Sequence, residues 1–182
     1  MQIVVGIDPG HGMSNREHAR YDPGAVHEDI HEAKIALAVG MLLRDQCRQR
    51  GWTAHMTRLS NVEPMPLRDR VARLRSLQCD AIVSIHCNAW HTPFANGTET
   101  LYLTSEWVAS AVQRRLIGAL GTKNRGAKQR DDLSILRYER ISILCELGFL
   151  SNKDDREVIT DPAKQLAAAM AIAEGLNETV RL

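Results

Sequence analysis

Apolar residues occur along the chain in two alternating patterns, short continuous runs and longer stretches with helical spacing. The short runs are QIVVGID (2–8), TAHMTR (53–58), DAIVSIH (80–86), TETLYL (98–103) and ISILCEL (141–147). Runs of this length, rich in β-branched residues and bounded by Gly, Pro or polar residues, are typical of strands. The continuous apolar run in DAIVSIH favours a strand in the middle of a sheet that is covered on both faces.

The stretches between these runs predict helices. Residues 29–50 have helical spacing at Ile35, Ala36, Val39, Leu42, Leu43 and Cys47, and Gly51 marks the end. A second helix opens at Pro66-Leu67, with one predicted apolar face made of Leu67, Val71, Leu74 and Leu77. Residues 105–120 and 162–179 predict two more. Strands that alternate with helices favour an α/β fold with a largely parallel sheet.

Composition limits the classes of function. The 182 residues are 44% hydrophobic and 25% charged, which suits one compact domain. A net charge of +1 and 4% aromatic residues do not favour a nucleic-acid partner. The basic clusters in residues 68–75 and 123–130 are expected to be solvated faces. No apolar run reaches transmembrane length.

The cysteines and the N-terminus indicate a protein made in the cytoplasm. MQIVVGID has no basic region, long apolar stretch or small-residue cleavage site, so no secretory signal is visible. Four scattered cysteines fit free, buried thiols better than a disulfide framework. Because side chains alternate along a strand, Cys87 and Cys145 are expected to face away from His86 and Glu146. A disulfide between these two cysteines is the less favoured alternative.

Three predicted strands end on side chains that bind metals or transfer protons, namely His11, His86 and Glu146. Each alone is ordinary, but the carboxyl ends of parallel strands meet at the edge of the sheet where ligands bind. Two imidazoles and one carboxylate are the protein ligands of many catalytic zinc sites. Glu32 and Glu28, near the start of the first helix, are both suitable carboxylates by spacing.

Two further residues near these strand ends have more ordinary explanations. His31, next to Glu32, would project about 100° away on a helix and is expected at the surface. Asp8 is either an acceptor that stabilises the Pro9-Gly10 turn or a partner of a ligand imidazole, and we favour the turn.

Several motifs then occur in a fixed order along nearly the whole chain: IDPGHG, DPGA, SIHCNA, NGTETLY, RGAK and CELGFLSN. Together they resemble the zinc-dependent N-acetylmuramoyl-L-alanine amidases of the amidase-3 type. The resemblance implies one α/β domain, with a mostly parallel six-stranded central sheet flanked by helices on both faces. It also implies that residues 1–182 form a single catalytic domain, without a separate cell-wall-binding domain.

The same resemblance implies a role for each site residue. His11, Glu32 and His86 match the ligands of one Zn²⁺ per chain, and Glu146 matches the general base and acid. Asn88, in the SIHCNA segment, is expected to position substrate. The bond cleaved by such enzymes joins N-acetylmuramic acid to the L-alanine of the peptidoglycan stem peptide. Independently of the resemblance, the basic residues Lys123, Arg125, Lys128 and Arg130 are expected to attract anionic wall polymers.

Two other functions fit the same residues. One is a zinc hydrolase of another amide, such as a carboxypeptidase or a small-molecule deacylase. The other is a non-catalytic cell-wall-binding module, which the presence of Glu146 disfavours. We expect a monomer. A catalytic domain without a visible signal resembles phage or prophage endolysins, which are made in the cytoplasm and reach the wall through a separate membrane lesion.

Overall fold

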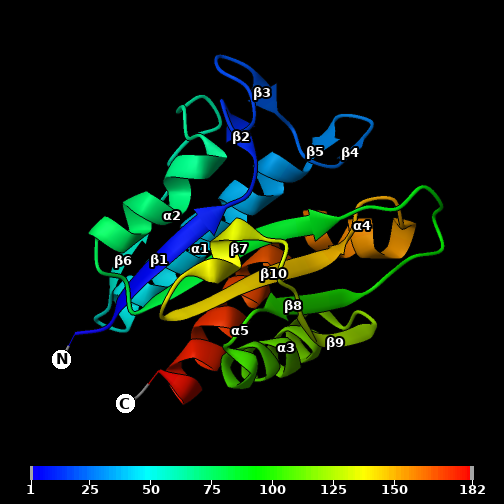
Figure 1. Ribbon diagram of the computed structural model, residues 1–182. Coiled ribbons are helices and arrows are strands. Elements are labelled where there is room, and N and C mark those ends of the chain that lie inside the picture. The colour runs from blue at the N-terminus through cyan, green and yellow to red at the C-terminus, as the bar shows by residue number, and fades with distance from the viewer. Residues whose placement is uncertain (1, 181–182) are drawn as a thin grey trace.

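A six-stranded sheet forms the centre of the computed structural model, which describes residues 2–180 (Figure 1). The strand order is β6 (Thr53–Met56), β1 (Val4–Pro9), β7 (Ala81–Asn88), β10 (Ile141–Phe149), β8 (Thr98–Tyr102) and β9 (Asn124–Gln129). The first four strands run parallel, β8 is antiparallel to β10, and β9 is parallel to β8. The predicted mostly parallel six-stranded sheet is therefore confirmed.

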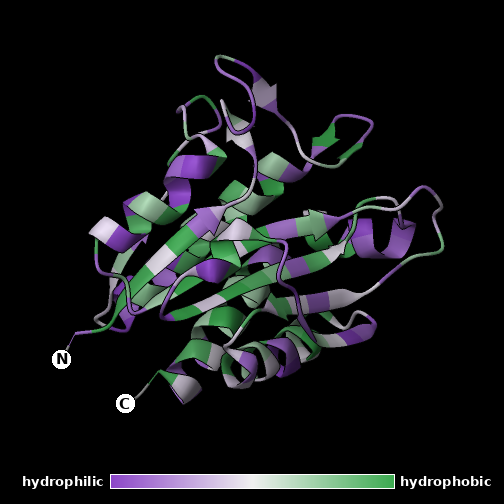
Figure 2. Cartoon of the chain, in the orientation of Figure 1, coloured by the Kyte–Doolittle hydropathy of each residue, from purple (hydrophilic) through white to green (hydrophobic). Residues whose placement is uncertain are grey.

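Helices cover both faces of this sheet, as predicted. One face packs against α1 (Glu32–Gln49), α3 (Glu106–Leu120) and α5 (Pro162–Thr179). The other face packs against α2 (Leu67–Ser76) and the 3₁₀ helix η1 (Ser134–Arg137). A short helix, α4 (Lys153–Thr160), follows β10. Figure 2 shows hydrophobic residues along the central strands and hydrophilic ones over much of α4.

Two small hairpins lie above the carboxyl ends of the parallel strands. They pair β2 (Gly12–Met13) with β3 (Tyr21–Asp22), and β4 (Val26–His27) with β5 (Ile30–His31). The predicted helix at residues 29–50 begins only after the second hairpin, at Glu32. This start sets the Glu32 side chain at the sheet edge where His11 and His86 also lie.

Two elements of the fold have no apolar pattern in the sequence. The strand β9 reads NRGAKQ, and it lies at the edge of the sheet with no fully buried residue. The helix α4 is mostly charged, and its N-terminus is capped by the Asn152 side chain, which accepts a hydrogen bond from the Asp155 amide. Neither element needs a continuous apolar stripe, because each covers the core with only one or two side chains.

The predicted apolar face of α2 is wrong in part. Leu67 and Leu77 are 47% and 36% exposed, whereas Leu74 and Arg70 are buried. The expectation that the arginines in residues 68–75 form a solvated face is therefore wrong for Arg70, whose exposed fraction is 1%. Arg70 faces the interior because it binds polar groups there, which are described below.

The pleat of the sheet separates the reactive residues from the cysteines. His86, Glu146 and Glu99 are neighbours across β7, β10 and β8, so their side chains project from one face. Cys87 and Cys145 pack in the core of the opposite face, as predicted. All four cysteines are buried free thiols, so no disulfide occurs within residues 2–180.

None of the helices within residues 2–180 combines the length and the apolar character needed to cross a membrane.

Candidate active site

His11, Glu32 and His86 come together at the carboxyl edge of the sheet. One ligand atom from each lies within 4.8 Å of the other two. Glu32 Oε1 lies 3.1 Å from His11 Nε2 and 2.9 Å from His86 Nδ1. Glu28, the other carboxylate that the spacing allowed, is exposed to solvent. The tertiary structure thus places Glu32, and not Glu28, with the two histidines.

Close packing of the backbone brings these three side chains together. His11 adopts a positive φ of 62°, unusual for a residue with a side chain. A Cβ atom on Gly10 would lie 2.3 Å from the His86 ring, and one on Gly24 would lie 2.4 Å from Glu32 Oε2. Gly10 and Gly24 are therefore required because side chains of the triad occupy the space beside their Cα atoms.

Two buried arginines hold the loop that carries His11. The Arg58 guanidinium donates hydrogen bonds to the carbonyl oxygens of Pro9 and Gly10, at 3.0 and 2.7 Å. The Arg70 guanidinium donates to those of Pro9 and His11, at 2.7 and 2.6 Å. Burial, reinforced by the nearby Arg70 charge, lowers the pKa of Arg58 to about 10. These contacts fix successive carbonyl groups and so hold His11 in its strained conformation.

Asp8 is the buried counter-charge in this network. Its carboxylate accepts hydrogen bonds from Arg70 at 2.9 Å, from the Thr57 hydroxyl at 2.7 Å and from the Ser84 hydroxyl at 2.8 Å. Among the described residues, Asp8 forms no hydrogen bond or ion pair with an imidazole. Asp8 therefore supports the turn through Arg70, in line with the favoured of its two predicted roles.

Removing Arg70 should destabilise the fold. Arg70→Met leaves the Asp8 carboxylate buried without its cation, and losing one partner of a buried ion pair costs about 3–5 kcal/mol. Urea unfolding at constant m-value would measure this loss. Arg68→Met is the matched control, since the Arg68 side chain is 86% exposed and its loss should change stability by about 0.5 kcal/mol at most. Equal unfolding midpoints for the two variants would contradict the buried network.

Asp22 orients His11, and the sequence reasoning did not assign it this role. Its Oδ2 atom lies 3.0 Å from His11 Nδ1 and accepts a hydrogen bond from Asn15 at 2.6 Å. Burial opposes ionisation, but the hydrogen bonds from His11 and Asn15 prevail and lower the pKa of Asp22. A carboxylate on Nδ1 favours the tautomer in which Nε2 keeps its lone pair and faces Glu32. The DPGA segment, a turn beside the histidine loop, was the one available signal.

Asp22→Asn should weaken zinc binding by about 10- to 100-fold, the usual effect of losing a partner of a ligand histidine. The amide retains the size of the side chain but not its charge, so the His11 tautomer is held less firmly. Zinc affinity, measured by competition with a chelating dye, tests this. Asp45→Asn, on the exposed face of α1, is the control. An unchanged affinity in Asp22→Asn would contradict the orienting role.

Glu146 lies beside the triad with an unpaired carboxylate oxygen. It is the register partner of His86 on the neighbouring strand. Its Oε2 atom is buried without a hydrogen-bond partner among residues 2–180. Burial raises the pKa of Glu146 to about 7. A carboxylate with this proton affinity is able both to accept and to return a proton near neutral pH.

The pKa of Glu32, inside the triad, is shifted in the opposite direction to that of Glu146. Burial opposes ionisation of Glu32, but its contacts with the His11 and His86 imidazoles lower its pKa far below the usual value. Burial also opposes the charged form of His86, but the contact with Glu32 raises the pKa of His86. Glu32 is therefore the permanently charged member of the group, as a ligand for a cation requires.

Asn88 lies two residues after His86 on β7, and among the described residues its side chain forms no hydrogen bond with the triad. Its side-chain amide donates a hydrogen bond to Glu99 Oε1 at 3.3 Å. Its predicted role in positioning substrate stays a prediction.

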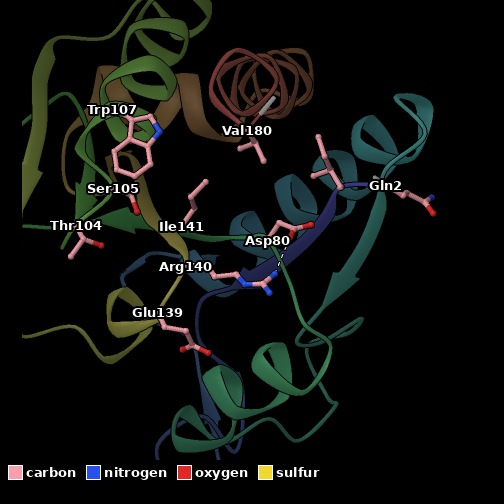
Figure 3. Close-up of a pocket in the computed structure, with 10 residues that line it drawn as sticks. Gln2, Asp80, Thr104, Ser105, Trp107, Glu139, Arg140, Ile141 and Val180 are labelled. Atoms are coloured by element: carbon pink, nitrogen blue, oxygen red, sulfur yellow. Dashed lines mark hydrogen bonds and ion pairs between the residues drawn. The ribbon is translucent and has the colours of Figure 1, made fainter. Parts of the chain in front are cut away.

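A cavity of about 870 Å³ lies at the opposite edge of the sheet, around Asp80, Trp107 and Ile141 (Figure 3). These residues adjoin the amino-terminal ends of the parallel strands, whereas ligands of such sheets bind at the carboxyl ends. The charged residues Arg140 and Asp80 are paired with each other at 2.9 Å. This cavity therefore has no set of reactive groups comparable with that around Glu32.

The residues of the triad fit a zinc ion. Ligand atoms bound to tetrahedral zinc at 2.0–2.1 Å lie about 3.3 Å apart, close to the two distances from Glu32 Oε1 to the histidine nitrogens, 3.1 and 2.9 Å. Two imidazoles and one carboxylate leave a fourth position for water or substrate. Fold and site together define an α/β protein with a His–Glu–His group suited to holding a metal ion at the carboxyl edge of its sheet.

The chain belongs to the N-acetylmuramoyl-L-alanine amidase family Amidase_3, whose profile matches residues 5–178. It is 34% identical over 180 residues to Bacillus subtilis YqiI, covering 96% of this chain and 83% of that protein. It is 31% identical over 179 residues to the Bacillus subtilis N-acetylmuramoyl-L-alanine amidase LytC, covering 94% of this chain but 34% of LytC.

Solved structures agree with this assignment. The catalytic domain of CwlV, an N-acetylmuramoyl-L-alanine amidase from Bacillus (Paenibacillus) polymyxa var. colistinus, is 29% identical and matches with a TM-score of 0.88. The match covers 99% of this chain and 98% of that domain. The predicted fold and family are confirmed.

Proposed function

We propose that this protein is a zinc-dependent peptidoglycan amidase, which hydrolyses the bond between N-acetylmuramic acid and the L-alanine of the stem peptide. The observation that carries the proposal is the convergence of His11, Glu32 and His86 beside the unpaired carboxylate of Glu146. Membership of the amidase family supplies the substrate class.

In this proposal, His11, Glu32 and His86 hold one zinc ion. Zinc bound there would polarise the scissile carbonyl and lower the pKa of a water molecule towards ~7. Glu32 contributes the negative charge of the ligand set. Asp22 holds the His11 ring so that Nε2 stays available.

Glu146 performs the proton transfers. Its free Oε2 accepts the proton of the attacking water, and the same oxygen then returns that proton to the departing amine of L-alanine. Both transfers use one carboxylate, so the proton count balances without another acid. Burial raises the pKa of the Glu146 carboxyl above its usual range, which favours uptake of the proton.

Digestion of purified peptidoglycan tests the proposal. We expect new amino termini on L-alanine, no new reducing sugar ends, and activity that is lost with a chelator and restored by zinc. Release of a carboxyl-terminal amino acid would instead indicate a carboxypeptidase. Binding to the wall without any new amine would indicate a non-catalytic module.

A further inference from the structure

A second charged group continues the row of reactive side chains across the sheet. Glu99 on β8 is the register partner of Glu146 on β10, and it is 6% exposed. On the next strand, β9, the Arg125 Nε and Lys128 Nζ atoms each lie 2.6 Å from Glu99 Oε2. The row therefore runs from His86 through Glu146 and Glu99 to two cations at the edge of the sheet.

The charges in this group do not cancel. Two cations share one carboxylate oxygen, and the other oxygen accepts a hydrogen bond from the Asn88 amide. Among the described residues, Glu99 is the one hydrogen-bond acceptor of the Lys128 ammonium, whose side chain is 43% exposed. One unit of positive charge is thus left beside solvent, with donors directed away from Glu99.

The position of Arg125 is fixed by more than its ion pair. Its guanidinium carbon lies 4.9 Å from the centre of the Phe149 ring, and a nitrogen lies 3.4 Å from the Asn96 carbonyl oxygen. A planar cation held on an aromatic face loses little freedom when it binds a second anion. These contacts prepare the pair of cations to recognise a carboxylate, which accepts two charge-assisted hydrogen bonds.

The distance from the triad sets where that carboxylate lies in a substrate. Neighbouring strands are about 4.8 Å apart, so the cations lie roughly 10–15 Å from His86 along the row. An extended peptide spans about 3.3–3.6 Å per residue. The side chains of the substrate and of Lys128 cover part of the distance between the triad and the cations. A carboxylate on the second or third residue of the stem peptide, counted from L-alanine, therefore reaches the cations.

We propose that Arg125 and Lys128 bind a free carboxylate on the second or third residue of the stem peptide, and so favour acidic over amidated stem peptides. This inference rests on the proposed amidase function. It assigns the basic residues of the RGAK segment to a defined group of the substrate, in place of general attraction to anionic wall polymers.

The inference is tested with two soluble muramyl peptides. They differ only at the second stem residue, which carries a carboxylate in one peptide and a carboxamide in the other. We expect the wild-type kcat/KM to be about 10-fold higher for the acid, the effect of a charge-assisted hydrogen bond. Lys128→Gln should bring the ratio of the two kcat/KM values close to one. In this variant Arg125 still pairs with Glu99, so the buried Glu99 carboxylate keeps a cation beside it. The remaining pair carries no net positive charge that could attract the substrate carboxylate. Because both substrates are soluble, wall polymers do not contribute.

Arg130→Gln is the matched control, because Arg130 follows the same strand but pairs with Asp132. It should keep the wild-type ratio, and Lys128→Arg should restore the preference for the acid. If Lys128 only supported the fold, Lys128→Gln would slow both substrates in proportion, and this unchanged ratio would overturn the inference. Equal wild-type rates on an acid and amide pair, tested at both the second and the third residue, would also overturn it while leaving the amidase function intact. Cleavage of no muramyl peptide would overturn both.

Discussion

Glu146→Gln is expected to lower kcat on muramyl peptides by about 10²- to 10⁴-fold, the usual contribution of a positioned acid and base. The glutamine amide is nearly the same size but cannot accept the proton of the attacking water. Because Glu146 Oε2 has no hydrogen-bond partner among residues 2–180, the substitution breaks no bond to that atom. Zinc content and unfolding temperature should therefore stay at wild-type values.

The measurement is the initial rate of release of the L-alanine amine, together with zinc analysis of the same sample. Glu157→Gln is the control, as its side chain is 68% exposed on α4. A Glu146→Gln enzyme that keeps more than about a tenth of wild-type activity would place the proton transfers on another group. Loss of zinc together with activity would mean that Glu146 supports the metal rather than the chemistry.

The second large effect is expected for Glu32→Ala. This variant should bind zinc so weakly that the ion is lost during gel filtration, and it should have no measurable amidase activity. The Glu32 Oε1 atom lies between the two histidine nitrogens. Its removal takes away the one negative charge of the ligand set and leaves a space at the centre. The loss of zinc affinity should exceed the 10- to 100-fold expected for a residue that only supports a ligand.

Thermal unfolding provides a readout that does not depend on activity. Zinc at 100 times its Kd stabilises a folded protein by about 2.7 kcal/mol, so zinc should raise the Tm of the wild type but not that of Glu32→Ala. Glu28→Ala is the matched control, because Glu28 is the exposed carboxylate that the sequence spacing also allowed. One zinc per chain in Glu32→Ala, or none in Glu28→Ala, would contradict the assignment of the ligand.

Much of the fold follows from local patterns of apolar residues. The central strands β1, β7 and β10 and the helices α1, α3 and α5 have patterns dense enough to identify them, because each buries a whole face or both faces. The edge strand β9 and the helix α4 bury little, so their sequences retain mainly polar residues. The buried face of α2 was misjudged because Arg70 is buried through hydrogen bonds rather than through apolar contact.

The residues of the site also divide into those that the sequence predicts and those that only the tertiary structure identifies. The histidine and glutamate positions at the ends of β1, β7 and β10 were predictable, because parallel strands bring their carboxyl ends to one edge. Spacing alone did not separate Glu32 from Glu28, since both occupy the approach to α1, and it was the resemblance to the amidase family that selected Glu32. Asp22 was missed because its partner His11 lies across a loop of the first hairpin.

Local sequence is thus sufficient for the order of the elements that bury a whole face, for the parallel central strands and for three reactive residues at the edge of the sheet. The apolar pattern that identifies these elements extends over only a few residues of each. Contacts between distant residues decide the rest. Arg58 and Arg70 reach the His11 loop across 48 to 61 positions of sequence, and Lys128 meets Glu99 across 29. Such pairings depend on which polar groups are desolvated together, and only the packed chain determines that.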